Sequence, residues 1–471
     1  MISFLLNDTL VESTEPEGMV LLDIIRNKQH LPGTKIGCRE GDCGACTVLI
    51  GELRDGHVEY KSMTSCLLAL ANVRGKHIVT VEGLNMDNLS PVQQAIVDES
   101  GTQCGFCTPG FVVSLSGCCL SRENVTEELV VRAIDGNICR CTGYKSIQRA
   151  TAILAVQLAS KDAKDPIGWS VKNGFLPSYF NGIKERLKTI PPAPPVRAGN
   201  FPPLAGGTDL YVQKHDTMHH SPVRSVFNDE ELKGIRFEGD QCTIGGACTA
   251  ADLMASSELK HHFPSLEKYL LLVSSTPIRN MGTLAGNFVN ASPIGDLTVF
   301  FLALDSTIEL GKGGKFPAPT RSLKLRDLYK GYKQLDKSPD EILTSVRFTI
   351  PTGNTRFHFE KVSKRTHLDI ASVNSAIRLE LNGDTIREAH MSAGGVAPIP
   401  KYLANTSAFL AGKLISKDTV RSAITVMNEE IAPINDARGT ADYKRLLLRQ
   451  LFFAHFMELF PERFNLHELV A

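Results

Sequence analysis

The sequence predicts a multidomain α+β protein. Its 471 residues exceed what one hydrophobic core usually organises. Short β-branched segments near the N-terminus give way to helical periodicity near residue 86, and a proline-rich stretch at 188–203 precedes a second mixed region. We therefore expect domains at 1–84, 85–160, 203–350 and 351–471, with 161–202 as a linker that leads into the third domain.

The composition is that of an ordinary globular protein. Hydrophobic residues make up 42% of the chain and charged residues 22%, and 51 basic residues balance 51 acidic ones. This balance argues against a nucleic-acid surface, a disordered tail or a membrane coat. The sequence lacks an apolar stretch of the roughly 18 residues that a spanning helix needs, and its start lacks the basic region of a signal peptide. We expect a cytoplasmic protein that binds neither nucleic acid nor membranes.

The first domain reads as a small mixed β-sheet. Apolar residues alternate on both sides of the polar pair Asn7-Asp8, which predicts a strand hairpin over 2–13. Residues 19–29 have the i, i+3, i+4 spacing of a short amphipathic helix. β-branched residues predict further strands in 46–53 and 77–84, after a loop that is dense in cysteine and glycine.

The second domain has the signals of a helical bundle. Ser90 precedes Pro91 as an N-cap before a first helical proline, and Thr126 is followed by Glu127 and Glu128. The linker at 161–202 combines charge with proline, so we expect no core element there. Helices are predicted at 91–100, 109–121, 126–137 and 144–160, and later at 417–431 and 443–460, after strands at 373–383 and 388–397.

Ten of the twelve cysteines precede residue 142. In a reducing compartment, clustered thiols serve metal binding or catalysis more often than disulfides. Cys38, Cys43 and Cys46 have the x4, x2 spacing of plant-type [2Fe–2S] ferredoxins, and Cys66 is the only further cysteine before the helical domain. Glycines in this loop let backbone N–H groups approach the sulfides. The alternative is a structural zinc site, which usually uses paired C-x2-C knuckles.

A second group of cysteines lies in the helical domain. Cys104 and Cys107 precede one predicted helix, and Cys139 and Cys141 precede another. Amides at helix N-termini favour thiolates and the negative cluster that they hold. Taken alone this set fits zinc and iron–sulfur equally, whereas beside the first set electron transfer is favoured. The other cysteines, Cys118, Cys119, Cys242 and Cys248, are interpreted as packing residues.

Two segments of the third domain have the character of cofactor loops. "PLAGGTDL" at 203–210 can bring backbone N–H groups against a diphosphate, although a tight turn between strand and helix has the same pattern. "RNMGTLAGNFVNASPIGD" at 279–296 mixes small and polar residues, so a planar cofactor could lie against its backbone; the alternative is a surface loop. A G-x-G-x-x-G fingerprint that opens a helix is missing, which disfavours a Rossmann site.

These motifs carry a family resemblance. "GCREGDCGACTVL", the cysteine in "MTSCLLAL", "TQCGFCTPGFVVS" and "GNICRCTGYKSI" resemble, in order and spacing, the two-[2Fe–2S] module of the xanthine dehydrogenase family of molybdenum hydroxylases. The loops at 203–210 and 286–296 resemble the FAD domain of that family. The resemblance implies a β-grasp plant-type ferredoxin domain at 1–84, a helical [2Fe–2S] domain at 85–160, an α+β FAD-binding domain at 203–350, and the α+β C-terminal domain of the flavoprotein module at 351–471.

The resemblance also implies roles for individual residues. Gln103 would hydrogen-bond the pterin across a subunit boundary, unless it is an ordinary surface glutamine, and residues 361–373 would pass close to the flavin and influence the approach of NAD⁺. One [2Fe–2S] cluster would be held by Cys38, Cys43, Cys46 and Cys66, the other by Cys104, Cys107, Cys139 and Cys141; the FAD diphosphate by Pro203, Leu204, Ala205, Gly206, Gly207, Thr208, Asp209 and Leu210; the rest of FAD by Asn287, Ser292, Pro293, Ile294, Gly295, Asp296, Asp305, Leu343 and Lys361.

By this resemblance the chain is expected to be the Fe–S/FAD subunit of a two-chain xanthine dehydrogenase. The chain has no substrate-oxidising centre, so catalytic residues are expected on a large molybdopterin-binding partner, in a dimer of heterodimers. Electrons from hypoxanthine or xanthine oxidation would pass through the 104–141 cluster, the 38–66 cluster and FAD to NAD⁺. Two alternatives remain: another molybdenum hydroxylase with an aldehyde or N-heterocycle substrate and another acceptor, or a non-enzymatic electron-transfer or zinc-structured binding protein.

Overall fold

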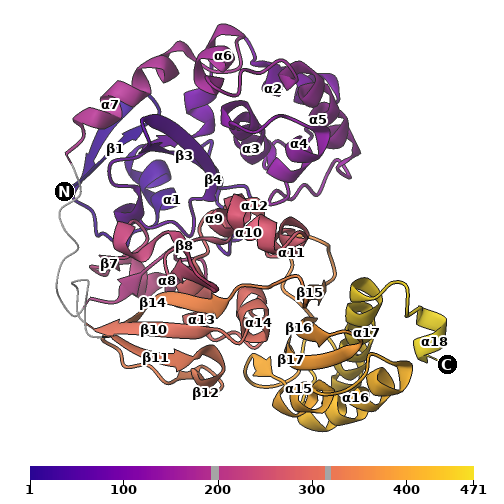
Figure 1. The fold of residues 1–471 in the computed structure, drawn as a ribbon. Coiled ribbons are helices and arrows are strands. Elements are labelled where there is room, and N and C mark those ends of the chain that lie inside the picture. The colour runs from indigo at the N-terminus through magenta and orange to yellow at the C-terminus, as the bar shows by residue number, and fades with distance from the viewer. Residues whose placement is uncertain (192–200, 313–319, 471) are drawn as a thin grey trace. The chain divides into compact units, whose positions relative to one another are not determined.

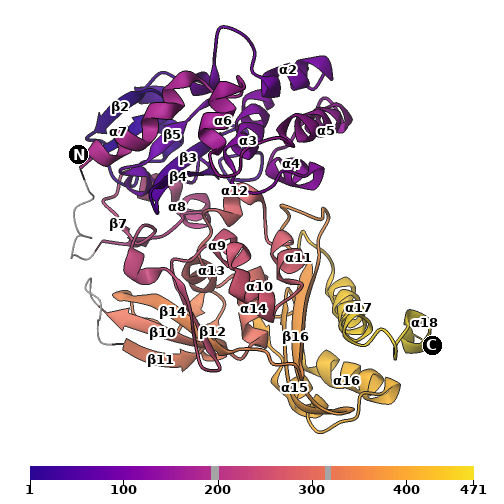
Figure 2. The same ribbon diagram turned by 45° about the horizontal axis from the view of Figure 1, so that its top comes forward.

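The computed structural model describes residues 1–191, 201–312 and 320–470, and it confirms a multidomain α+β fold (Figures 1 and 2). Two compact units divide the chain: 1–228 with 275–282, and 229–274 with 283–471. Much of the proline-rich stretch lies outside the described residues. Among the described helices, none is both long and apolar enough to cross a membrane.

The first unit begins with a five-stranded sheet of order β2-β1-β5-β3-β4. The predicted hairpin is present, and its turn places Asn7 at φ 52°. Strand β4 was not expected, because its sequence "HVEYKSMT" is polar on the side that faces solvent. The strands are β1 (Ile2–Leu6), β2 (Thr9–Ser13), β3 (Thr47–Arg54), β4 (His57–Thr64) and β5 (His77–Val79), and α1 (Leu21–Asp23) continues as a π-helix over Ile24–Lys28.

The helical part of this unit follows the predicted caps. Ser90 accepts a hydrogen bond from the N–H of Gln93, whose side chain accepts from the N–H of Ser90 in return, and Thr126 accepts from the N–H of Leu129. The apolar faces of the helices share one core with Leu49 and Val79 of the sheet. The helices are α2 (Pro91–Asp98), α3 (Thr108–Leu120), α4 (Glu127–Ala133) and α5 (Lys145–Leu158).

The expectation that 161–202 forms no core element is wrong over 166–189. The segment contains α6 (Pro166–Lys172), a 3₁₀ turn (Ser178–Gly182) and α7 (Ile183–Thr189). Asp165 caps α6, and Phe180 is buried against Tyr60 and His77 of the sheet. The charged and proline-rich flanks hid these buried aromatic residues in the sequence pattern.

The first unit also contains part of the predicted FAD domain. Strands β6 (Pro203–Leu204) and β7 (Arg224–Ser225) pair in parallel, and α8 (Leu210–His219) lies between them in the chain. Helix α12 (Thr276–Arg279) is held by Asp135, which accepts from the N–H of Thr276 at 2.7 Å and from Nη2 of Arg279 at 2.5 Å. The side chains of Asp135 and Arg279 are only 5% and 1% exposed, so this ion pair is buried.

The second unit contains two larger sheets. One has the order β11-β10-β14-β9-β8 and the other β15-β16-β17-β18, with every pair antiparallel. Helix α14 packs against β16 and β17, while α17 packs against β15 and β16 (Figure 2). The strands are β8 (Ile235–Glu238), β9 (Gln241–Gly245), β10 (Thr307–Lys312), β11 (Thr320–Lys324), β12 (Tyr329–Gly331), β13 (Gln334–Leu335), β14 (Glu341–Thr349), β15 (Thr355–Val362), β16 (Val373–Asn382), β17 (Thr385–Gly394) and β18 (Lys401–Tyr402).

Helices of the second unit cover these sheets. Those that precede β10 are α9 (Ala250–Ala255), α10 (Ser257–His262), α11 (Leu266–Leu271), α13 (Leu284–Asn290) and α14 (Asp296–Ala303). Those of the C-terminal part are α15 (Ala404–Leu410), α16 (Lys417–Glu430), α17 (Ala441–Leu459) and α18 (Leu466–Val470). Strands β14 and β15 lie on either side of the predicted domain boundary at 350.

Candidate redox site

Four thiols of the first unit converge at the loop before β3. The thiol of Cys38 contacts that of Cys43, and the thiol of Cys46 contacts that of Cys66. The contact with Cys43, assisted by backbone N–H donors such as Glu40, lowers the pKa of Cys38 to about 5. All twelve cysteines of the chain are free thiols, so no disulfide competes with this arrangement.

The loop that carries these thiols needs glycine. Gly44 has φ 66°, and a Cβ there would lie 2.4 Å from the carbonyl oxygen of Gly136. The N–H of Cys38 points to Sγ of Cys43 over 3.5 Å, and the N–H of Glu40 points to Sγ of Cys38 over 3.4 Å. The loop therefore supplies both the thiols and backbone donors that stabilise negative charge on sulfur.

The second set of thiols lies where two helices begin. Cys107 is the residue before α3, and Cys139 and Cys141 lie shortly before α5. The thiol of Cys107 contacts that of Cys139, and the thiol of Cys104 contacts that of Cys141. Thr142 donates its hydroxyl to Sγ of Cys139 at 3.1 Å, a donor that the sequence reasoning did not identify.

The two sets are joined by backbone contacts. The N–H of Ile138 donates to the carbonyl of Cys43 at 3.0 Å, and the side chain of Asn137 donates to the carbonyl of Gly44 at 3.1 Å. Their exposure differs: Cys46 and Cys66 are buried, whereas the residues Cys104 and Cys141 are exposed. Each site consists of two contacting pairs of thiols, an arrangement that fits the two irons of a [2Fe–2S] cluster. Gln103 is exposed beside Cys104.

The loop at 203–210 connects β6 to α8 in a tight turn. Gly207 has φ 82°, and a Cβ on Gly206 would lie 1.8 Å from the carbonyl oxygen of Met281. These glycines are therefore required by packing, whichever ligand the loop binds. Among the described residues, the N–H groups of Gly206, Gly207 and Thr208 find no protein acceptor. Three free donors just before a helix suit a diphosphate.

Polar residues of the second candidate loop form a connected network. Asp296, the first residue of α14, accepts from Nζ of Lys361 at 2.7 Å and from the amide of Asn374 at 2.5 Å. Lys361 is buried and also donates to the carbonyl of Leu272 at 2.7 Å. The structure thus brings together Asp296 and Lys361, both of which the resemblance implied, and adds Asn374, which was not predicted.

The other predicted FAD residues of this unit have protein partners. The amide oxygen of Asn287 accepts from both the N–H and the hydroxyl of Thr298, and the hydroxyl of Ser292 accepts from the N–H of Ile294 at 3.4 Å. The carbonyl of Pro293 accepts from the N–H of Gly395, and the N–H of Gly295 donates to Ser292.

The last two predicted FAD residues, Asp305 and Leu343, have different surroundings: Asp305 forms ion pairs, whereas Leu343 is buried in a sheet. Asp305 has φ 51° and pairs with Lys324 at 2.7 Å and with Arg326 at 3.3 Å. Leu343 is a buried residue of β14 that lies opposite Leu310. Their direct contact with FAD stays a prediction.

Four family models match the chain in sequence order. They describe a 2Fe-2S iron-sulfur cluster binding domain (residues 4–70), a [2Fe-2S] binding domain (80–152), an FAD binding domain in molybdopterin dehydrogenase (195–352) and a CO dehydrogenase flavoprotein C-terminal domain (358–459). The fold and both thiol sites therefore define an iron–sulfur flavoprotein, an oxidoreductase with two [2Fe–2S]-binding domains and one FAD-binding domain.

Curated relatives name the family. The chain is 28% identical to a xanthine dehydrogenase of Emericella nidulans, over 98% of this chain and 39% of that protein, and 26% identical to the aldehyde oxidase of Homo sapiens, over 95% and 38%. It thus spans about two fifths of the length of these relatives. Together with the order of the four matched domains, these relatives support assignment of the chain to the molybdenum hydroxylase family, as its Fe–S/FAD part.

A solved structure supports the same assignment. The reconstituted CO dehydrogenase from Oligotropha carboxidovorans has a chain that is 26% identical, with a TM-score of 0.51; the match covers 57% of this chain and 92% of that one. A Cu,Mo-CO dehydrogenase in a cyanide-inactivated form matches with a TM-score of 0.50 and 26% identity, over 54% and 88%.

Proposed function

We propose that this chain is the electron-transfer part of a xanthine dehydrogenase. It would receive electrons from a molybdopterin centre on a large partner chain, which oxidises hypoxanthine and xanthine to urate, and deliver them to NAD⁺. The observation that carries the proposal is the pair of four-thiol sites within one unit, joined by the hydrogen bond from Ile138 to Cys43. The names of the curated relatives support the substrate class.

The exposure of the two thiol sites supports a direction of electron flow. Cys104 and Cys141 are exposed beside the exposed Gln103, so this site would face the partner chain. Cys46 and Cys66 are buried, so this site would lie further from the partner chain and next in the relay. When bound, the clusters supply one-electron steps and FAD couples them to a two-electron acceptor.

Cofactor analysis of the purified chain tests the proposal. We expect two [2Fe–2S] clusters and one FAD per chain, measured as iron, acid-labile sulfide and released flavin, with the matching visible absorption. Anaerobic NADH should then bleach both the flavin and the iron–sulfur absorption, because electron transfer to NAD⁺ is reversible. A colourless protein that contains zinc would overturn the proposal.

A second candidate is the equivalent part of another molybdenum hydroxylase. The similarity to aldehyde oxidases and to CO dehydrogenase chains favours keeping this alternative. A flavin that dithionite bleaches but NADH leaves oxidised would support it.

Co-purification tests the proposed partner of the xanthine dehydrogenase assignment: we expect a large molybdenum-containing chain in a dimer of heterodimers, with xanthine as a substrate of the complex.

A further inference from the structure

A cavity in the first unit is lined by residues that the proposed electron transfer does not use. Its volume is about 420 Å³, and its walls are Asp23, Arg39, His215, Asp216, His219 and His220. Asp23 comes from α1, and the four residues from His215 onward come from the end of α8 and its C-cap. Helix α8 is kinked at Lys214 (φ −140°), so His215 and His219 lie one turn apart in the segment after the kink.

Three of these side chains converge. Asp23, His215 and His219 each offer one ligand atom, and the three atoms lie within 4.8 Å of one another. In a tetrahedral zinc site, bonds of about 2.1 Å place the ligand atoms about 3.4 Å apart. Small side-chain rotations would therefore close the group around one ion.

One of the three side chains, His219, has a ring nitrogen without a hydrogen-bond partner. Nδ1 of His219 is buried, makes no hydrogen bond, and lies 3.6 Å from Oδ2 of Asp23. An unsatisfied buried polar atom destabilises the folded protein unless a ligand satisfies it. A neutral imidazole keeps the lone pair that a metal ion requires.

Arg39 contacts two of the three candidate ligands. Its Nη2 donates to Oδ1 of Asp23 at 2.8 Å, and its Nη1 lies 3.2 Å from Oδ2 and 3.4 Å from Nε2 of His215. A guanidinium can only donate, so the one lone pair of Nε2 of His215 accepts from Arg39, and an ion that binds this nitrogen would displace Nη1 from it. Arg39 could stay on Oδ1 while Oδ2 binds an ion, as in metal sites whose carboxylate ligands are themselves hydrogen-bonded. Its charge would weaken the affinity.

We propose that Asp23, His215 and His219 bind one divalent transition-metal ion of the zinc type. Two imidazole nitrogens with one carboxylate oxygen suit zinc and its neighbours, whereas calcium and magnesium prefer all-oxygen sites. The cavity leaves room for water at the remaining coordination position. The site would tie α1 to α8, and it does not depend on the identity of the substrate or of the electron acceptor.

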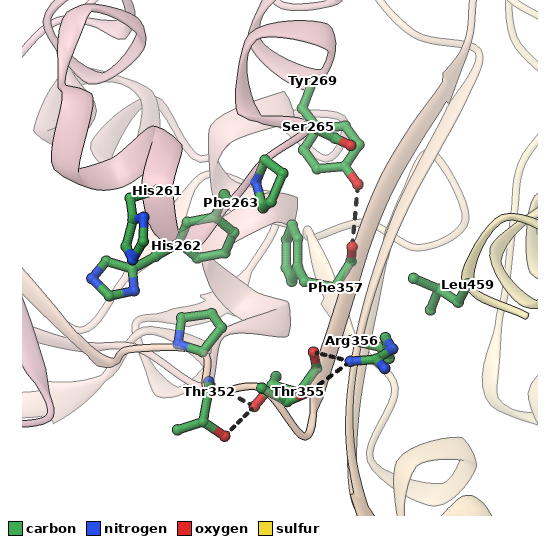
Figure 3. A pocket seen from close by; sticks show the side chains of 13 residues that line it. His261, His262, Phe263, Ser265, Tyr269, Thr352, Thr355, Arg356, Phe357 and Leu459 are labelled. Carbon is green, nitrogen blue, oxygen red and sulfur yellow. Dashed lines mark hydrogen bonds between the residues drawn. The ribbon is translucent and has the colours of Figure 1, made fainter.

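Another pair of histidines provides a matched control. His261 and His262 line a pocket of about 440 Å³ in the second unit, together with Phe263, Tyr269 and Arg356 (Figure 3). No carboxylate lines this pocket, and the ring of His262 stacks on Phe237. Among the described residues, only Asp23, His215 and His219 form a group of potential metal ligands with this geometry.

Zinc binding by the holoprotein tests the proposal. The wild type, H215Q, H219Q and the double variant H261Q/H262Q are dialysed against zinc chloride, and zinc and iron are measured in the same samples. We expect one zinc per chain in the wild type and in H261Q/H262Q, with unchanged iron. H215Q and H219Q should each bind that zinc at least tenfold more weakly. Their visible spectra should equal that of the wild type, which excludes misfolding as the cause.

Thermal unfolding gives a second readout. Zinc should raise the melting temperature of the wild type, since an ion that binds only the folded state stabilises it, and should leave that of H219Q unchanged. Equal zinc binding by the wild type, H215Q and H219Q would overturn the proposal. So would a loss of zinc that is confined to H261Q/H262Q.

Discussion

The backbone N–H of Ile138 donates a hydrogen bond to the carbonyl of Cys43 at 3.0 Å. Cys43 belongs to the first thiol site, and Ile138 directly precedes Cys139 of the second. A short route of covalent bonds and one hydrogen bond therefore links the two sites. The amide of Asn137, buried and bonded to both Gly44 and Ser114, fixes this route in place.

Serine substitutions should separate the two clusters. We expect Cys43→Ser to abolish one of two EPR-distinguishable [2Fe–2S] signals and Cys107→Ser to abolish the other, because each thiol belongs to a different set. Cys118→Ala is the control, since Cys118 is a buried residue of α3 outside both sets. If both signals survive either serine substitution, the proposed ligand sets are wrong.

The pair Asp135–Arg279 should be a major contributor to stability. Asp135→Ala removes the partner of a guanidinium that is 1% exposed, and breaking such a buried pair costs about 3–5 kcal/mol. We expect a clearly lower melting temperature in calorimetry. The exposed pair Glu185–Lys188 is the control, since Glu185→Ala should leave the melting temperature nearly unchanged. Similar melting temperatures for the two variants would contradict this ranking.

Gly206→Ala tests the packing of the candidate diphosphate loop. The added methyl would meet the carbonyl oxygen of Met281, and relief of such overpacking costs about 1–3 kcal/mol through a backbone shift. We expect a lower flavin content per chain, because the three free N–H donors would move. Gly182→Ala is the matched control, since nothing lies within 4 Å of its Cβ position. Full flavin content in Gly206→Ala would argue against a diphosphate at this loop.

The buried pair His358–His455 should make the second unit sensitive to acid. Their Nδ1 atoms are 2.7 Å apart; burial lowers the pKa of His358 to about 4, and burial followed by the charge of His358 lowers that of His455 further. The unfolded chain takes up protons below about pH 6.5 while the folded protein does not. Stability is therefore fully present above that pH and falls toward pH 4, by about 2 kcal/mol at pH 5 from His358 alone.

Calorimetry across this range measures the effect. The double variant H358Q/H455Q should be less stable at neutral pH, yet its melting temperature should fall less between about pH 6.5 and pH 5. His57→Gln, at an exposed histidine, should keep the slope of the wild type. An unchanged slope in the double variant would contradict the assignment.

Local sequence patterns were enough to predict much of this molecule. The thiol sets could be found because each is built from closely spaced cysteines beside glycines or helix starts. The buried aromatic residues at 175–180 could not, because charged and proline-rich neighbours masked them. Pairs of residues that are far apart in the chain could not be predicted from local patterns, because only packing brings them together. Examples are Asp135 with Arg279, Asn374 with Asp296, and Asp23 with His219.

The anchoring of α12 by Asp135 has a consequence for synthesis on the ribosome. The first unit is not a contiguous stretch: its last piece, 275–282, follows forty-six residues of the second unit, 229–274. Until Arg279 has left the exit tunnel, the carboxylate of Asp135 has no guanidinium to meet. The iron–sulfur part of the chain therefore cannot complete its native contacts while it is still the only part translated, and a gene truncated after residue 228 would encode a unit that lacks one of its own elements.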